Sequence, residues 1–225
     1  MQNGKIYTIG YAGFRNDIEK FLDILEDYSV DEIIDVRSFP SSDIHYNFNG
    51  GAIKLKLQTR DNLKGDCKTG ATCPISYTHM PVQFGARQSN KELYPKGYLD
   101  FELFSKQASF VEGIESVEQM VSEGKNVCLL CSEPEPTDCH RCILIARAFW
   151  KKNYPVTHLF ADKIPTTQKD IEQKWIEKYK REHETPGQMS FEGFSEENNE
   201  KDEQEIINEA YRKRNEKIGY RMEET

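Results

Sequence analysis

The sequence predicts an α/β fold: a mostly parallel sheet of about five strands with helices on both faces, plus a charged C-terminal helical or disordered tail. Three observations support this prediction. Short apolar segments alternate with amphipathic ones, which is the pattern of strands connected by helices. The length of 225 residues fits one domain of ordinary size with an extension. The acidic charge is concentrated at one end, because residues 182–225 contain 13 acidic and 6 basic side chains.

The first part of the chain alternates between apolar runs and polar or amphipathic segments. Lys5–Ile9 is a predicted strand that ends at a glycine, and Glu32–Val36 is a second apolar strand. Between them, Asp17–Tyr28 has apolar residues at helical spacing opposite a charged face. Ser38–Gly51 is rich in Ser, Asn, Pro and Gly, which predicts a loop. We then expect a basic helix at Ala52–Leu63. A surface insertion with Cys67 and Cys73 follows at Gly65–Pro74, and a third strand at Ile75–His79.

A long helical pattern precedes the most apolar strand. Leu99–Glu123 has helical spacing, with a break expected near Ser109 or Gly113. The pattern ends at Gly124, a residue that often follows the last helical turn. Asn126–Cys131 is the longest continuous apolar run and is the predicted fourth strand.

The remaining elements become more charged towards the end of the chain. Cys139–Lys151 is a predicted amphipathic helix, Val156–Phe160 a fifth strand and Gln168–Glu182 a charged helix. Glu184–Asp202 has the composition of a linker. Glu203–Lys217 predicts one exposed helix with a thin apolar stripe, and we expect this tail to be solvated rather than packed.

The charge distribution limits the possible partners. We divide the chain into an α/β domain at residues 1–183 and an acidic linker and tail at residues 184–225. The net charge is −8, almost all of it in the tail, so the body gives no broad basic surface for duplex nucleic acid. There is no apolar run long enough for a membrane span and no secretory signal, so we expect a cytoplasmic protein with reduced cysteines.

Polar residues cluster directly after three of the predicted strands. Ligands of parallel α/β sheets bind beyond the carboxyl ends of the strands, so these clusters predict one pocket. The clusters are Gly10-Tyr11, Asp35 and Arg37 with Pro40-Ser41, and Cys131-Ser132-Glu133 followed by Cys139-His140-Arg141.

With these segments the sequence resembles the family catalogued as Domain of Unknown Function 488, over about residues 5–160. The matching segments are Thr8–Tyr11, Asp35–Arg37 with Pro40 and Ser41, the region of Tyr77, Gly85 and Arg87, Cys131–Glu133, and Cys139–Arg141. Two positions depart from the family pattern: Ala12 replaces a small hydroxyl residue, and Phe84–Arg87 keeps the arginine but changes the turn. The resemblance implies the fold and the site, whereas the family name implies no reaction.

Two cysteines are candidates for the nucleophile or acid, namely Cys139 at the start of the fourth predicted helix and Cys131 at the end of the fourth strand. Asp138 is a suitable N-cap and would place Cys139, His140 and Arg141 in the first turn. A helix N-terminus and neighbouring cations favour a thiolate. We therefore expect Cys139, with His140 and Cys131, to carry the chemistry.

The other candidates would bind or activate a substrate. The candidate general bases or arginine-orienting groups are Asp35 and Glu133. The candidate groups for binding a phosphate or carboxylate are Gly10, Tyr11, Arg37, Ser41, Arg87 and Arg141.

Structural roles remain alternatives for each of these groups. Asp35 and Arg37 are also typical of an ion pair at a sheet edge, and Cys131 of a small buried apolar residue. The two Cys-x-x-Cys spacings leave open a redox pair at Cys139 and Cys142, and a four-cysteine zinc site at Cys128, Cys131, Cys139 and Cys142.

The predicted function is an enzyme that uses this Cys/His/Arg pocket on an anionic substrate, such as a small phosphate-bearing ligand, a nucleotide or a nucleic acid. The first alternative is a non-catalytic module that binds an anion or nucleotide, with a tail that recruits a partner protein. The second is a zinc protein that uses the Cys/His cluster. No cofactor is predicted for the first two, and the sequence predicts no oligomeric state.

Overall fold

The computed structural model describes residues 3–63, 75–183 and 202–222. The predicted α/β fold is confirmed, with one six-stranded sheet in the order β3-β2-β4-β1-β5-β6. All neighbouring strands are parallel except the last pair, β5 and β6. The strands are β1 (Ile6–Gly10), β2 (Glu32–Asp35), β3 (Ser76–His79), β4 (Val127–Cys131), β5 (Val156–Leu159) and β6 (Thr166–Thr167).

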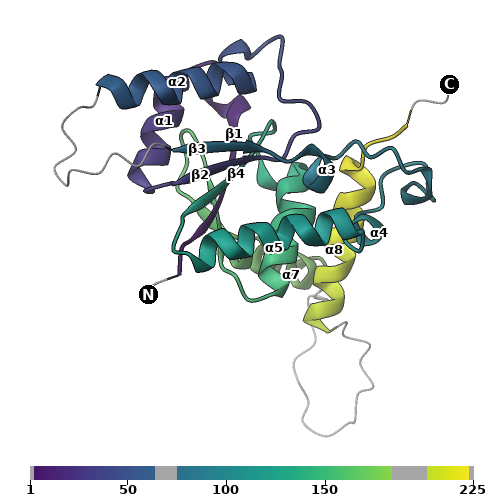
Figure 1. The fold of residues 1–225 in the computed structure, drawn as a ribbon. Helices are drawn as coiled ribbons and strands as arrows, with labels where there is room; N and C mark the ends of the chain where they lie inside the picture. Colours follow the sequence, from purple (N-terminus) through teal and green to yellow (C-terminus); the bar gives the residue numbers. More distant parts are fainter. Residues whose placement is uncertain (1–2, 64–74, 184–201, 223–225) are drawn as a thin grey trace, which may run out of the picture.

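The two faces of the sheet have separate apolar clusters because side chains alternate along each strand. In β4, Leu129 and Cys131 join one cluster, whereas Cys128 and Leu130 join the other. Figure 1 shows one layer of helices above the sheet and a larger layer below it. The upper helices are α1 (Ile18–Asp27) and α2 (Gly50–Leu63). The helices of the other layer are α5 (Ala108–Ser122), the π-helix η5 (Arg141–Ala146) that continues into α6 (Arg147–Lys151), α7 (Gln168–His183) and α8 (Glu203–Ile218).

Sequence periodicity does not reveal the shortest elements, which have too few residues for a pattern. The two-residue strand β6 is one of them. The others are η1 (Tyr11–Phe14), η2 (Tyr46–Phe48), α3 (Pro81–Phe84), η3 (Lys91–Leu93), α4 (Phe101–Phe104) and η4 (Pro136–Asp138). The predicted insertion at Gly65–Pro74 lies outside the described residues.

The long helical pattern is broken earlier than expected. The chain leaves the helix after α4, at Ser105, and begins α5 at Ala108, so the break lies just before Ser109, and the alternative break at Gly113 is wrong. Gly113 has a packing role instead. A Cβ atom there would lie 2.7 Å from the Cβ of Gln83, so its glycine lets α3 approach α5.

The expectation of a solvated tail is wrong for α8. Its apolar stripe faces the domain, with Ile206 and Tyr211 buried. The Tyr211 hydroxyl also hydrogen-bonds Gln168 and Glu172 of α7. Helix α8 packs because its few apolar side chains are large and buried, and because Tyr211 adds hydrogen bonds. The charge composition of the tail does not reveal these interactions.

Asn215 fixes the end of α8 to the α4 region. Its side-chain oxygen accepts a hydrogen bond from the backbone N–H of Phe101 at 2.9 Å, and its amide group donates to the carbonyl of Leu99 at 2.8 Å. None of the helices among the described residues is long and apolar enough to cross a membrane.

Replacing Tyr211 tests whether α8 is part of the folded unit. Tyr211→Ala should lower the free energy of unfolding by about 3–5 kcal/mol, because it removes a fully buried aromatic side chain. Urea unfolding followed by circular dichroism measures this change. Arg212→Ala, on the exposed side of the same helix, should change stability by no more than about 0.5 kcal/mol. Equal effects of the two substitutions would show that α8 is not packed in solution.

Candidate functional site

A cavity of about 490 Å³ opens beyond the carboxyl ends of β2 and β4. This volume is in the range of small-molecule sites. Its lining includes these predicted site residues: Arg37, Ser41, Arg87, Cys131, Glu133, Cys139 and His140. The structure therefore brings together groups from widely separated parts of the chain. The other predicted residues, Gly10, Tyr11, Asp35 and Arg141, are buried behind the cavity.

Cys139 occupies the N-cap position of its helix, so the prediction that Asp138 caps it is wrong. The backbone of Cys139 is extended, with φ −138° and ψ 142°. Its carbonyl accepts hydrogen bonds from the N–H groups of Cys142 and Ile143 at 3.1 and 3.2 Å. Asp138 instead binds Arg214 of α8, at 2.8 Å. The thiol of Cys139 thus lies at the positive end of the helix dipole.

His140 lies beside both cavity sulfurs. Its Nδ1 is 3.8 Å from the Sγ of Cys131 and 3.9 Å from the Sγ of Cys139. Its Nε2 is 3.1 Å from the carbonyl oxygen of Val36, which can only accept a hydrogen bond. The proton on Nε2 is therefore fixed, and Nδ1 faces the sulfurs.

The two cavity cysteines differ in protonation. Burial alone would raise the pKa of Cys139, but a hydrogen bond from Cys131 and the charges of Arg141 and His140 hold it well below the ordinary value. Burial raises the pKa of Cys131, and the neighbouring Cys139 adds to the rise. Burial opposes a charge on His140, but the Cys139 thiolate outweighs this and raises the pKa of His140. The arrangement favours a thiolate–imidazolium pair beside a neutral thiol.

Glu133 turns its carboxylate towards these sulfurs although the residue as a whole is exposed. Its Oε2 lies 3.3 Å from the Sγ of Cys131. Loss of water around the carboxylate, with repulsion from the Cys139 thiolate, raises the pKa of Glu133 to about 7. A carboxyl group with this pKa can both donate and accept a proton near neutral pH.

Asp35 holds Arg37 in place at the cavity floor. The Nε of Arg37 donates to both carboxylate oxygens of Asp35, at 2.8 and 3.0 Å, and Nη2 donates to Oδ2 at 2.5 Å. The Tyr77 hydroxyl also donates to Asp35. The aromatic ring of Tyr11 lies 5.0 Å from the Arg37 guanidinium. Both Asp35 and Tyr11 thus contact Arg37 and do not line the cavity.

One guanidinium nitrogen of Arg37 remains without a partner. The side chain is only 4% exposed, and among the described residues nothing accepts a hydrogen bond from its buried Nη1. Burial opposes the charge, but Asp35 outweighs it and raises the pKa of Arg37 above its ordinary value. A cavity residue with a permanent charge and a free donor is suited to an anion.

Arg141 fixes the loop that carries Glu133. Its guanidinium is fully buried and donates to the backbone carbonyls of Glu133 and Pro134, at 2.5 and 3.1 Å. Gly10 makes this approach possible, because a Cβ atom there would lie 1.8 Å from the carbonyl oxygen of Glu133. Both residues position the site; neither lines the cavity.

Three residues at the cavity mouth were missed from the sequence. Ser38 accepts a hydrogen bond from the backbone N–H of Arg87 at 2.8 Å. The Arg87 guanidinium lies over the rings of both Phe39 and Tyr220, with ring centroids at 5.5 and 4.8 Å. Phe39 and Ser38 adjoin the predicted Arg37 cluster and could have been included. Tyr220 had no such signal because it comes from the tail.

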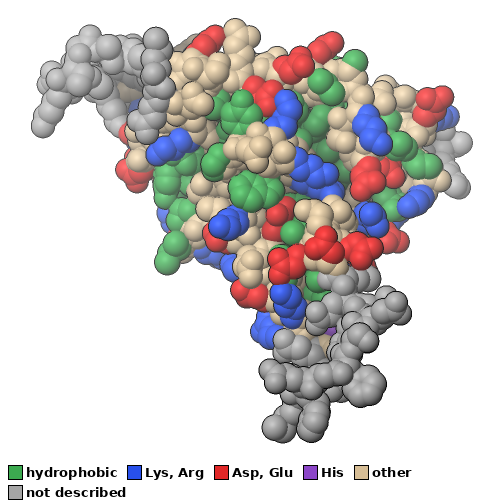
Figure 2. All heavy atoms as spheres, turned by 90° about the horizontal axis from the view of Figure 1, so that it is seen from below, with side chains coloured by type: hydrophobic (Ala, Val, Ile, Leu, Met, Phe, Trp, Pro, Cys, Tyr) green, Lys and Arg blue, Asp and Glu red, His purple; other side chains and the backbone are tan. Residues whose placement is uncertain are grey.

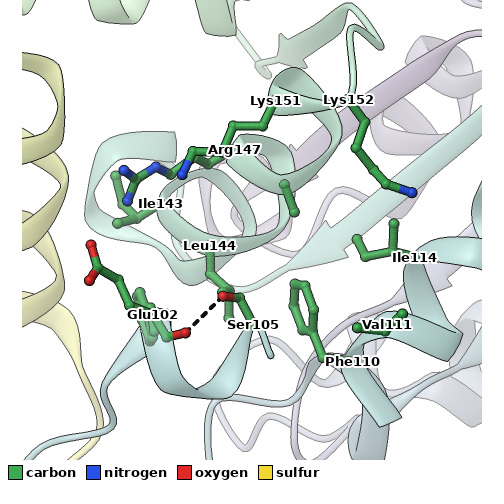
Figure 3. A pocket seen from close by; sticks show the side chains of 12 residues that line it. Glu102, Ser105, Phe110, Val111, Ile114, Ile143, Leu144, Arg147, Lys151 and Lys152 are labelled. Atoms are coloured by element: carbon green, nitrogen blue, oxygen red, sulfur yellow. Dashed lines mark hydrogen bonds between the residues drawn. The ribbon is translucent and has the colours of Figure 1, made fainter. Parts of the chain in front are cut away.

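A second pocket, of about 260 Å³, shares no lining residue with this cavity. Figure 3 shows Phe110, Val111 and Ile114 on one side of it and Arg147, Lys151 and Lys152 on the other. Neither a cysteine nor a histidine lines it. The chemistry predicted from the sequence therefore belongs to the first cavity.

The four-cysteine zinc site does not form. Cys128 is buried on the opposite face of the sheet, and the Sγ of Cys142 lies 3.5 Å from the Oε1 of Gln168. Three donor atoms are nevertheless close together, because those of Cys131, Cys139 and His140 all lie within 4.8 Å of one another.

Comparison with known proteins gives one finding. A family model described as "Domain of unknown function DUF488" matches residues 17–148, which is more than half of the chain. Neither a curated protein nor a solved structure matches the chain.

A methyl group at position 10 tests the support of the Glu133 loop. Gly10→Ala should lower the free energy of unfolding by about 1–3 kcal/mol, because the added atom overlaps the Glu133 carbonyl. Gly51→Ala is the matched control. A Cβ atom at Gly51, in α2, meets no neighbour, so that substitution should leave stability unchanged or raise it by up to about 1 kcal/mol. Thermal and urea unfolding measure the stability of both variants. If Gly10→Ala is as stable as Gly51→Ala, the close packing of Gly10 against the Glu133 carbonyl is contradicted.

Proposed function

The chain belongs to the family described as Domain of unknown function DUF488, and from its cavity we propose that it is a cysteine-dependent hydrolase or transferase acting on an anionic substrate. In this proposal Cys139 is the nucleophile and Arg37 binds the anion. The observation that carries it is the position of the Cys139 thiol, which lies at a helix N-terminus, beside His140, on the wall of an open cavity.

The neighbours of Cys139 supply what a thiol nucleophile needs. A thiolate requires a lowered pKa, and the helix dipole, the imidazolium of His140 and the buried Arg141 all favour the negative charge. The hydrogen bond from His140 to the Val36 carbonyl keeps the ring oriented towards the sulfur. This is the relation of nucleophile, base and orienting group that covalent catalysis uses.

The proposed reaction has two steps. The Cys139 thiolate attacks the electrophilic atom of the substrate and forms a covalent bond to it, while the bond to the leaving group breaks and His140 donates a proton to that group. Water or another acceptor then attacks the covalent intermediate. Glu133 takes the proton of the attacking group, and Cys139 leaves again as a thiolate. A Glu133 pKa of about 7 suits this second step, because the carboxylate is substantially ionised at neutral pH.

The charges of the cavity favour an anionic substrate. The free Nη1 of Arg37 points to an acceptor that the protein itself does not provide. Asp138 also lines the cavity, but Arg214 and Lys217 of α8 bind its carboxylate at 2.8 and 3.1 Å. The face in Figure 2 has interspersed acidic and basic side chains and no continuous basic band. That face, which is seen from below the molecule of Figure 1, offers no broad basic surface for a long duplex.

A zinc-dependent reaction is the second candidate, and the close approach of three donor atoms favours it. Catalytic zinc sites have three protein ligands and one open position, and Cys131, Cys139 and His140 would be those ligands. The hydrogen bond from His140 to a backbone carbonyl is typical of a metal-bound histidine. Zinc would supply a Lewis acid or an activated water.

Selective alkylation tests the thiol proposal. Iodoacetamide at about pH 6.5 should modify Cys139 first, because its lowered pKa preserves the thiolate. Cys128 and Cys142 are internal controls that should remain unmodified, since burial raises the pKa of Cys142 to about 12 and raises that of Cys128 further. Peptide mapping by mass spectrometry over time gives the rate at each cysteine.

The contribution of His140 is measured in the same experiment. His140→Asn should slow alkylation of Cys139, because it removes the imidazolium charge that favours the thiolate and so raises the pKa of the thiol. Once that pKa lies above the pH of the assay, each further unit lowers the thiolate fraction about ten-fold. If Cys139 reacts no faster than Cys67, the proposal of a cysteine nucleophile is rejected.

Metal analysis decides the second candidate. Reduced protein purified without chelator should contain close to one equivalent of zinc if the three donors form a metal site, and Cys131 and Cys139 should then resist alkylation until a chelator is added. A zinc content below about 0.1 equivalent, with alkylation unaffected by the chelator, would exclude this candidate and leave the thiol chemistry.

A further inference from the structure

Three planar groups meet at the mouth of the cavity. The Arg87 guanidinium lies over the ring of Phe39 and over that of Tyr220, and all three residues line the same cavity as Arg37. Phe39 is 62% exposed, so one face of its ring is open to a ligand. Arg87 is exposed as well, and its side chain has no carboxylate partner among the described residues.

Hydrogen bonds hold the backbone of two of these three residues, Arg87 and Tyr220. The backbone N–H of Arg87 donates to the Ser38 hydroxyl, and the close approach of Ser38 requires Gly85, where a Cβ atom would lie 3.0 Å from the Ser38 oxygen. The carbonyl of Tyr220 accepts a hydrogen bond from the backbone N–H of Leu99 at 2.8 Å. Hydrogen bonds thus hold the backbone of Arg87 and of Tyr220 in place at the mouth, which reduces the chain ordering that binding requires.

We propose that this mouth binds a planar ring of the substrate while Arg37 binds its phosphate, so that the cavity accepts nucleoside monophosphates or similar aromatic phosphate esters. The proposal deepens the function proposed above, because it uses the same cavity and assigns the class of anion. Phe39 and Tyr220 are the specificity-determining residues.

The chemistry of the mouth distinguishes a ring from other substituents. Nucleobases stack on aromatic side chains and on arginine through their π-faces, whatever the base. A sugar or an alkyl group lacks such a face. The anion site lies in the same cavity, where Arg37 has the free donor and Asp138 is neutralised by Arg214 and Lys217.

Tyr220, one of the two proposed specificity-determining residues, lies outside the region that the family model matches. The family model covers residues 17–148, and the wall that contains Tyr220 comes from the segment after α8. The floor of the cavity, with Arg37, Cys131 and Cys139, lies within the matched region. The stacking at the mouth thus depends on a C-terminal segment that the family match does not include.

Calorimetric titration with three probes tests the assignment in the full chain. The probes are adenosine 5′-monophosphate, ribose 5-phosphate and inorganic phosphate. Adenosine 5′-monophosphate should bind at least about five-fold more tightly than ribose 5-phosphate, because base stacking adds to the phosphate contact. Phe39→Leu and Tyr220→Leu should each remove most of this difference and leave the affinity for inorganic phosphate unchanged.

Tyr46→Leu is the matched control, since Tyr46 is also 62% exposed but does not line the cavity. It should leave the affinities for all three probes unchanged. Arg37→Lys should weaken all three, because it removes the free donor. Equal affinity for adenosine 5′-monophosphate and ribose 5-phosphate, or a preference that survives both leucine substitutions, would overturn the assignment.

The outcome is independent of the catalytic proposal. Ring-dependent binding with an unreactive Cys139 would reject the cysteine enzyme and retain the specificity of the mouth. A reactive Cys139 with no ring preference would reject the mouth and retain the enzyme.

Discussion

The buried guanidinium of Arg141 is the interaction on which the site depends. It bonds two carbonyls of the loop after β4, and its Nε lies 3.3 Å from the Thr8 hydroxyl of β1. One side chain thus connects two central strands, the Glu133 loop and the start of the helix. A fully buried cation is costly unless its donors are satisfied and an opposite charge is near. The backbone carbonyls satisfy the donors, and the charge of Arg141 helps to hold the pKa of the buried Cys139 thiol below its ordinary value.

Arg37 is also a buried cation whose charge must be compensated, but its hydrogen bonds differ from those of Arg141. Asp35 compensates its charge and fixes its orientation, yet the buried Nη1 has no hydrogen-bond partner among the described residues, and Arg37 lines the cavity. The two arginines therefore differ in their hydrogen bonds. Arg141 donates to the protein's own carbonyls, whereas one nitrogen of Arg37 has no partner among the described residues. Sequence reasoning grouped both as anion-binding residues because charge type alone does not show which donors are already occupied.

Local patterns predicted the strands and the main helices, and the rule about strand ends predicted where the site residues meet. Alternation along β4 places Cys128 and Cys131 on opposite faces of the sheet. The errors came from long-range contacts. Asp138 is a good N-cap by type, but Arg214 and Lys217 compete for its carboxylate, so Cys139 takes the N-cap position. Gly113 has the appearance of a helix break, yet its missing side chain serves close helix packing. Nothing in the local sequence of the tail indicates that Tyr220 reaches the cavity.

A continuous chain of buried hydrogen bonds explains how the C-terminal helix and the site form one unit. The Tyr211 hydroxyl bonds Gln168, whose Oε1 lies 2.9 Å from His158 Nε2, and the Nδ1 of His158 lies 2.8 Å from the Thr8 hydroxyl beside Arg141. Burial lowers the pKa of His158 to about 3, so the ring stays neutral and does not repel the Arg141 charge. Because the Oε1 of Gln168 can only accept, the neutral ring donates from Nε2 to Gln168 and accepts at Nδ1 from the Thr8 hydroxyl, so the donors run from β1 towards α7. Through this chain, α8 supports the residue that positions Glu133, and through Tyr220 the segment after it forms part of the cavity wall.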